Sequence, residues 1–264
     1  MTIYALSSGP GLSGLAVIRI SGHKCIEIVK KMTKGDLPTP RVATLRKIIK
    51  TKSEELIDEG IILWFPGPNS YTGEDLLELH VHGGRAVIDA ILKSISEISD
   101  CRIAEPGEFT KLAFLNGKIN LLQAESISDL ISSETEIQRR QALDIMSGHH
   151  GKKYEAWRSK LLKILSNIEA KIDFPEEDLP KSILNDIVKI SYDVKKEILK
   201  VIDDKKVGER IREGFKIAIL GPTNAGKSSL LNYLSNRDVA IVSEIAGTTR
   251  DVIEAHLNIE GYPV

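Results

Sequence analysis

The sequence is poor in cysteine, with only Cys25 and Cys101 among 264 residues. The two lie far apart and neither stands in a CxxC or CxxH pattern, which argues against a zinc site and against a disulfide framework. No run approaches the roughly 18 apolar residues of a membrane span, and the N-terminus lacks a charged segment followed by an apolar stretch. These absences predict a protein of the reducing cytoplasm with no membrane anchor.

An excess of charge of either sign is also absent, because 36 Lys and Arg residues stand against 37 Asp and Glu residues. No global positive field therefore indicates a polyanionic partner, although a local basic patch stays compatible with these numbers. The composition, 42% hydrophobic and 28% charged, is that of an ordinary globular protein. A chain of this length exceeds one average domain, so we expect two or three.

The first expected domain, residues 1–118, mixes short strands with helices. The apolar runs 15–20 and 61–65 each end at Gly-containing or Pro-containing turns, which is typical of strands. The strand 77–82 alternates, with Leu77, Leu79 and Val81 on one face and Glu78, His80 and His82 on the other. A helix is expected over 85–98, and the segment is predicted to be an α+β domain.

The second expected domain, residues 119–212, has helical periodicity. Two apolar stripes at spacings of three and four residues run over 154–172 and 183–201, separated by the acidic, proline-bearing turn 173–178. We predict two antiparallel helices that contribute to a helical-bundle core, which the pattern favours over a coiled coil.

The third expected domain, residues 213–264, has the pattern of an α/β domain. A buried strand is predicted over 215–220, then a Gly-rich turn, a helix over 228–234 and a half-exposed strand over 253–259. The whole chain is thus predicted to be a multidomain α+β and α/β protein.

The turn between that strand and helix carries a phosphate-binding motif. Residues 221–228, GPTNAGKS, fit G-x-x-x-x-G-K-[ST] in the strand and helix context that the motif requires. Its glycines let backbone N–H groups point at phosphate oxygens, Lys227 would hold the β and γ phosphates, and the Ser228 hydroxyl would bind Mg²⁺. A chance match has odds of about one per cent before that context is required, so nucleotide binding is the favoured interpretation. The motif by itself does not choose between ATP and GTP.

A second polar loop, residues 243–251, follows. Its sequence SEIAGTTRD supplies two threonine hydroxyls before a strand, as a phosphate-sensing switch would. Alone this is a weak signal, because such pairs in polar loops are usually solvated.

Together, GPTNAGKSSLLN and EIAGTTRD resemble the TrmE-Era-type GTPases. The stretches GLAVIRISG, WFPGPNSYTGEDLLELHVHGG and AEPGEFTKLAFLNGKINLLQAESISDLI resemble the TrmE/MnmE family of tRNA modification GTPases, and the resemblance covers essentially all 264 residues. It implies an N-terminal folate-binding and dimerising domain, a central helical domain and a GTPase domain inserted into the helical one.

The resemblance also implies an activity. With the flavoprotein MnmG, in a heterotetramer built on a homodimer, the family installs a C5 (carboxymethyl)aminomethyl group on the wobble uridine of tRNA. The one-carbon unit comes from a tetrahydrofolate derivative, 5-formyl- or methylene-tetrahydrofolate. Hydrolysis of GTP, with Mg²⁺ and K⁺, drives the conformational cycle, and tRNA is engaged through the complex.

For folate, the resemblance assigns Arg19, Glu78 and Lys118. The chemistry is reasonable, since a carboxylate accepts paired hydrogen bonds from an aminopyrimidine edge and cations serve polar or acidic groups. Taken singly, each residue has a plainer explanation as a solvated surface charge. His80 and His82 share a strand face with the spacing of a metal pair, but no third ligand is identifiable nearby.

For the nucleotide, the resemblance assigns a longer set: Asn224, Ala225, Gly226, Lys227, Ser228, Ser229, Ser243, Glu244, Ile245, Ala246, Gly247, Thr248 and Thr249. Ser228 and Thr249 are expected to bind Mg²⁺. Asn224, Ser243, Ile245 and Thr248 are expected to surround K⁺, which can neutralise developing phosphate charge. The family commonly has Thr at the position of Ser243. The DxxG and NKxD motifs do not occur, so catalytic residues are expected beyond residue 264 and the polypeptide as written is expected to hydrolyse GTP poorly or not at all.

Two other hypotheses stay open at this stage. The chain could be a folate-binding dimerisation module that carries an inactive GTPase stub. Alternatively, it could be a P-loop regulatory switch with no connection to RNA.

Overall fold

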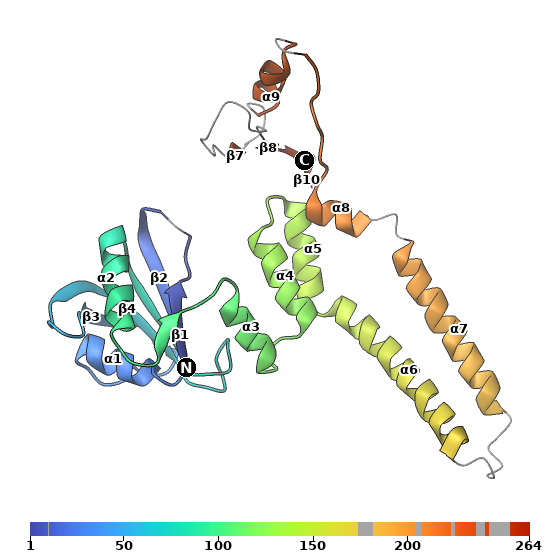
Figure 1. Cartoon of the computed structure of the whole chain (residues 1–264), viewed down its shortest axis with the longest axis horizontal. Helices are drawn as coiled ribbons and strands as arrows, with labels where there is room; N and C mark the ends of the chain where they lie inside the picture. The colour runs from blue at the N-terminus through green and yellow to red at the C-terminus, as the bar shows by residue number, and fades with distance from the viewer. Residues whose placement is uncertain (10, 174–181, 204–206, 223–224, 236–240, 243–253) are drawn as a thin grey trace. The chain divides into compact units, whose positions relative to one another are not determined.

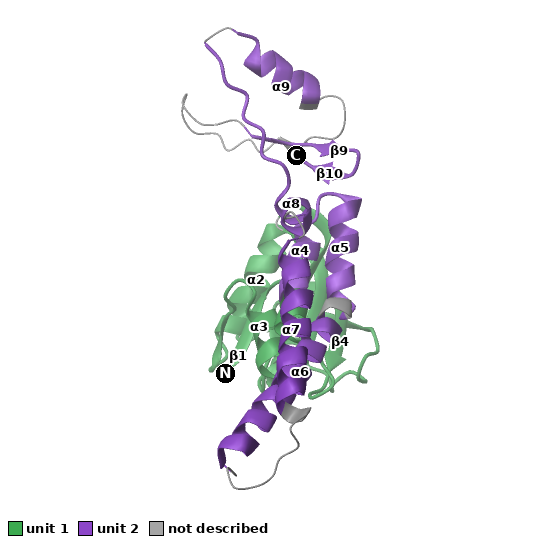
Figure 2. Cartoon of the chain, turned by 90° about the vertical axis from the view of Figure 1, so that its right-hand side faces the viewer, with its two compact units in different colours: residues 1–124 green, residues 125–264 purple. Residues whose placement is uncertain are grey.

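A computed structural model describes residues 1–9, 11–173, 182–203, 207–222, 225–235, 241–242 and 254–264. The chain divides into two compact units, Met1–Ala124 and Glu125–Val264 (Figure 2). Each unit is described separately below.

The first unit is built on a six-stranded sheet in the order β3-β4-β5-β2-β1-β6 (Figure 1). All neighbouring strands are antiparallel except β1 and β6, which are parallel. The strands are β1 Thr2–Leu6, β2 Ser13–Ser21, β3 Thr44–Ile49, β4 Leu56–Phe65, β5 Leu76–Gly83 and β6 Cys101–Ile103. The strands predicted over 15–20, 61–65 and 77–82 lie within β2, β4 and β5, so all three predictions are confirmed.

Two helices, α1 (Cys25–Thr33) and α2 (Arg85–Ser96), pack on one face of this sheet. The predicted apolar face of β5 is the core face, since Leu77, Leu79 and Val81 are 0%, 1% and 2% exposed. Removing such side chains from water is the main source of stability for this unit. The alternation leaves the other face of the sheet for polar side chains. The core includes Ile18, Ile20, Ile62, Leu77 and Leu79 from the strands, Ile28 and Met32 from α1, and Ile91 and Ile95 from α2.

Gly60 sets the spacing between β4 and β5. A Cβ atom at this position would lie 2.4 Å from the backbone oxygen of His80, a distance that real Cβ atoms do not adopt. Glycine is therefore required by the close approach of a neighbouring backbone. Any side chain here would push β4 away from the strand that carries Glu78 and His80.

Helix α3 (Glu108–Leu115) lies in the first unit. Helix α4 (Leu121–Ile131) begins in the last residues of that unit and continues into the second unit. In the second unit, α5 (Glu136–Met146) starts with a capping box between Thr135 and Gln138. It is followed by α6 (His149–Asp173), α7 (Ser182–Ile202) and α8 (Val207–Glu213). The two long helices predicted from the apolar stripes are α6 and α7, which run antiparallel beside each other (Figure 1).

The predicted helical-bundle core is only partly present in this pair. Trp157, Ile164 and Val194 are buried, and the Trp157 indole donates to Glu197 Oε2 at 2.6 Å. Farther along the stripes Leu161 is 48% and Ile172 69% exposed. Among the described residues the predicted core therefore occupies only part of the two stripes, because a two-helix hairpin covers only the strip where its helices face each other.

The C-terminal segment contains α9 (Lys227–Ser235), which confirms the helix predicted over 228–234. Two short ladders pair β7 (Ile241–Val242) with β8 (Ala255–His256), and β9 (Asn258–Ile259) with β10 (Tyr262–Pro263). Of the strand predicted over 253–259, residue 253 lies outside the described residues, and the rest forms two short strands, interrupted where Leu257 exchanges backbone hydrogen bonds with Val264.

The buried strand predicted over 215–220 is wrong. Phe215 donates its backbone N–H to Pro263, but no described strand pairs with residues 216–220, and Ile217 and Leu220 are 71% and 88% exposed. An apolar run becomes a buried strand only where other strands and helices cover it, and none of the described elements does so here.

The predicted multidomain fold class is confirmed, with an α+β N-terminal part, a helical part and mixed α and β elements at the C-terminal end. Among the helices within the described ranges, none combines the length and apolarity needed to cross a membrane.

Candidate functional site

Arg19 and Glu78 lie opposite each other at the centre of the sheet, on the face that α1 and α2 leave open. They are directly paired in the register between β2 and β5. Strand alternation turns both side chains away from the core, where they are 29% and 15% exposed. The sheet thus holds an opposite-charge pair in a fixed and partly desolvated position.

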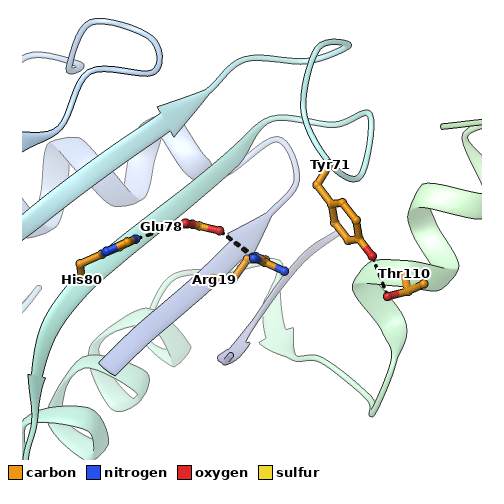
Figure 3. Close-up of polar contacts among 5 residues, drawn as sticks. All are labelled: Arg19, Tyr71, Glu78, His80 and Thr110. Atoms are coloured by element: carbon orange, nitrogen blue, oxygen red, sulfur yellow. Dashed lines mark hydrogen bonds and ion pairs between the residues drawn. The ribbon is translucent and has the colours of Figure 1, made fainter. Parts of the chain in front are cut away.

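Both oxygens of the Glu78 carboxylate have a protein partner (Figure 3). Arg19 donates to Oε1 through Nε at 3.0 Å and through Nη2 at 2.8 Å. His80, two residues along the same face of β5, lies with Nε2 3.2 Å from Oε2. Charge-assisted hydrogen bonds of this kind are stronger than neutral ones, so the carboxylate is anchored at both ends.

Two aromatic rings lie near the Arg19 guanidinium. Its Cζ lies 5.5 Å from the ring centroid of Tyr71 and 5.7 Å from that of Phe109, within the range of cation–π attraction. Tyr71 belongs to the β4–β5 loop, residues 66–75, and Phe109 to α3. The Tyr71 hydroxyl also hydrogen-bonds Thr110 Oγ1 of α3 at 2.9 Å (Figure 3). The loop and the helix together therefore border the charged pair.

Lys118 contacts the same loop. Its Nζ donates to the backbone oxygen of Pro68 at 2.8 Å, and nearby Asn116 donates to the oxygen of Thr72 at 2.7 Å. Of the three residues predicted to bind folate, the structure brings Arg19 and Glu78 into direct contact. It connects Lys118 to them through the loop that carries Tyr71.

An ion pair fixes the start of α3. Arg102 Nη1 donates to Glu108 Oε2 at 2.8 Å, and the backbone N–H of Glu105 donates to the same oxygen at 2.8 Å. The guanidinium of Arg102 lowers the pKa of Glu108 from its ordinary 4.5 to about 2. Gly107, at φ 75°, supplies the left-handed backbone that leads into the helix. These contacts position Phe109 and Thr110.

The ion pair predicts a pH-dependent stability. Glu108→Gln should lower the melting temperature at about pH 7, because the folded state then loses a preferentially stabilised carboxylate. Since the folded-state pKa lies below the unfolded one, this contribution is present above about pH 4.5 and is lost as the pH falls toward about 2. Scanning calorimetry of both proteins at about pH 7 and about pH 3 checks this. An equal difference at the two pH values would contradict it, and Glu55→Gln, on an exposed side chain, is the control.

His82 is held by a different carboxylate from His80. Its Nδ1 lies 2.8 Å from Asp58 Oδ1, and its backbone N–H donates to Oδ2 at 2.8 Å. Burial raises the pKa of Asp58, but these hydrogen bonds outweigh burial and lower the pKa below its ordinary value. In the part of the chain that the structure describes, no group of three or more His, Cys, Asp and Glu side chains is arranged to hold a metal ion.

The phosphate-binding motif is described in part. Lys227 begins α9, and its Nζ donates to the backbone oxygens of Gly221 and Pro222 at 3.0 and 2.6 Å. Gly226 adopts φ 85° just before the helix, and Ser228 and Ser229 lie in its first turn. Ala225 also belongs to the described residues. The other residues expected at the nucleotide and its ions lie outside them: Asn224, Ser243, Glu244, Ile245, Ala246, Gly247, Thr248 and Thr249.

Comparison with known families accounts for nearly the whole chain. Residues 2–118 match the family model described as the N-terminus of the GTP-binding protein TrmE, and residues 121–260 match the MnmE helical domain. The chain belongs to the TrmE/MnmE family.

Three relatives illustrate the TrmE/MnmE similarity. The chain is 70% identical over 264 residues to the tRNA modification GTPase MnmE of Pelagibacter ubique and covers 60% of that protein. It is 49% identical over 263 residues to the protein of the same name from Rickettsia akari, covering 59% of it. It is also 49% identical over 264 residues to a mitochondrial 5-taurinomethyluridine tRNA synthase subunit of Danio rerio, covering 53%. In each case the match takes in all of the chain, which spans little more than half the length of these curated relatives.

Three residues of the site, Tyr71, Phe109 and His80, were not predicted as folate-site residues from the sequence of this TrmE/MnmE chain. Tyr71 and Phe109 lie on a loop and a helix far apart in sequence, so nothing local linked them to Arg19. The sequence pattern suggests only a metal-ligand role for His80, although the alternation of β5 places it on the same face as Glu78. That shared face was the one signal that could have identified it as a partner of the carboxylate.

Proposed function

We propose that the N-terminal unit binds a reduced folate, 5-formyl- or methylene-tetrahydrofolate, through Arg19, Glu78 and Lys118. The observation that carries this proposal is the Arg19–Glu78 pair on the open face of the sheet, with both carboxylate oxygens anchored. Arg19 occupies both lone-pair sites of Oε1 and His80 occupies one of the two on Oε2, so Glu78 can accept two N–H groups from an aminopyrimidine once one of the Arg19 donors leaves Oε1.

The surrounding side chains suit the rest of such a molecule. Tyr71 and Phe109 offer aromatic surface beside Arg19 for a planar heterocycle. Lys118 carries a cation at the β4–β5 loop, where it can pair with an acidic group of the ligand once it leaves the Pro68 oxygen. When bound, the folate supplies a one-carbon unit. The role of these residues is to bind it and to orient it.

The motif at 221–228 supports nucleotide binding, and we propose GTP as the nucleotide because the relatives carry the name tRNA modification GTPase. In this structure the Lys227 ammonium donates to two loop carbonyls. Phosphate oxygens are charged and therefore stronger acceptors, so a bound nucleotide would replace these carbonyls as the partners of Lys227. The helix that follows adds the positive end of its dipole. Ser228 is proposed to bind Mg²⁺ with Thr249, and K⁺ is proposed to lie among Asn224, Ser243, Ile245 and Thr248.

The protein as a whole is proposed to act in tRNA modification. Its relatives carry the name tRNA modification GTPase, and the chain is similar to them over its entire length. We infer a cytoplasmic homodimer that works with MnmG on the wobble uridine, with tRNA engaged through the complex and GTP hydrolysis driving the cycle. Loss of the C5 modification from wobble uridine after deletion of the gene tests this role. Unchanged modification would favour a P-loop switch unconnected to RNA.

Calorimetry separates the two binding activities. We expect the chain to bind 5-formyltetrahydrofolate and, in buffer with Mg²⁺ and K⁺, GTP. Lys118→Ala should weaken folate binding about tenfold and leave GTP binding unchanged, because one charged hydrogen bond contributes about that factor. Lys227→Ala should do the reverse. Binding of folate without GTP would favour the dimerisation module with an inactive GTPase stub, and binding of neither ligand would refute the proposal.

A further inference from the structure

Arg19 does not by itself fix the orientation of Glu78. Both of its donor nitrogens, Nε and Nη2, bond the same oxygen, Oε1, so the pair lacks the parallel two-oxygen geometry of a bidentate arginine–carboxylate contact. The terminal torsion of a glutamate side chain is broad, and a carboxylate held at one oxygen can rotate about it. A second contact is needed to fix the plane.

His80 supplies that second contact. Its Nε2 lies 3.2 Å from Oε2, on the side of the carboxylate away from Arg19 (Figure 3). The cross-strand neighbours of His80 are Val17 on β2 and Ile61 on β4, both apolar. The ring is thus flanked on both neighbouring strands by side chains that offer no polar group, and Glu78 is the polar partner beside it on its own strand.

We propose that His80 is a positioning residue, which holds the plane of the Glu78 carboxylate so that both oxygens face an incoming pair of N–H donors. This inference rests on the proposed folate-binding function and deepens it. The ligand class it selects has two adjacent donors on a planar ring, such as the 2-amino group and the neighbouring ring N–H of a pterin. If the carboxylate could rotate, its hydrogen bond to one of these donors would be well aligned and its hydrogen bond to the other poorly aligned, so the second bond would be weakened.

The test measures the affinity of the full chain for 5-formyltetrahydrofolate and for its 2-desamino analogue. In the wild-type protein, removal of the 2-amino group should cost at least about tenfold, as for the loss of a hydrogen bond to a charged group. In His80→Leu, affinity for the complete ligand should fall about tenfold, and the penalty for removing the amino group should shrink to about threefold or less. His80→Gln, which retains an N–H donor, should restore most of both values.

Further variants separate positioning from structural damage. His80→Leu should have no additional effect in a Glu78→Gln background, because the carboxylate that it orients is then absent. His23→Leu is the matched control, since His23 lies on the surface of the same unit and pairs with Asp100. Its affinity for the folate should equal that of the wild type.

Three results would overturn the inference in distinct ways. Wild-type affinity in His80→Leu would show that the ring has no role at Glu78. An equal loss for both ligands, without recovery in His80→Gln, would show only structural damage. If the wild-type chain binds no reduced folate, the proposed function itself fails, whereas binding by the wild type with an unchanged His80→Leu variant removes the positioning role alone.

Discussion

Glu78→Gln is expected to reduce the affinity for 5-formyltetrahydrofolate about 100-fold. Glutamine has the same shape, but it replaces one acceptor oxygen by an NH₂ group that would face a donor of the ligand. It also removes the negative charge that Arg19 contacts through Oε1, so the guanidinium would be left partly desolvated without its counter-charge. Isothermal titration calorimetry on the full chain measures the change.

The loss must come from the site and not from unfolding. Glu59→Gln is the matched control, because Glu59 lies on the neighbouring strand β4 and is exposed. We expect its folate affinity to stay within about twofold of the wild type, since surface substitutions of this kind usually change free energies by less than about 0.5 kcal/mol. The melting temperature of Glu59→Gln should stay close to the wild-type value, and that of Glu78→Gln should fall but stay well above the temperature of the titration. A Glu78→Gln protein that binds folate normally would remove the carboxylate from the site.

The second large effect is expected in the core beneath the site. Leu79 is 1% exposed and is paired in register with Ile18 on β2 and Ile62 on β4, which are also fully buried. Leu79→Ala would leave a cavity among these side chains and should destabilise the first unit by about 2–5 kcal/mol. Because Leu79 lies between Glu78 and His80 on β5, unfolding of the first unit also removes the proposed folate site. In urea, Leu79→Ala should therefore lose folate binding at the same lowered midpoint at which the first unit unfolds.

Tryptophan fluorescence can report on this unit alone. The chain has two tryptophans, Trp64 in the core of the first unit and Trp157 in α6. In a Trp157→Phe background, urea unfolding followed through Trp64 should show an earlier midpoint for Leu79→Ala. Leu15→Ala, on a residue of β2 that is 55% exposed, is the control and should shift the midpoint little. Coincident midpoints for Leu79→Ala and its parent would contradict the assigned core.

The parts of the fold that could be predicted were those with a strong local period. The alternation of 77–82 identified both the core face and the polar face of β5, and the three-and-four spacing identified α6 and α7. The strand over 215–220 failed for the opposite reason. An apolar run indicates that a segment can be buried, but whether it becomes a strand depends on partners elsewhere, and none of the described strands pairs with residues 216–220.

The site divides along the same line. The sequence by itself determined the chemistry available, since its motifs carry the resemblance to the TrmE/MnmE family, which implies Arg19, Glu78 and Lys118 as folate contacts. Only the tertiary structure decided that Arg19 bonds one carboxylate oxygen and His80 approaches the other, with Tyr71 and Phe109 near the guanidinium. The physical reason is that periodicity records which way a side chain points along its own element. Which residues meet across elements depends on strand register and loop packing, and these are set by the whole fold.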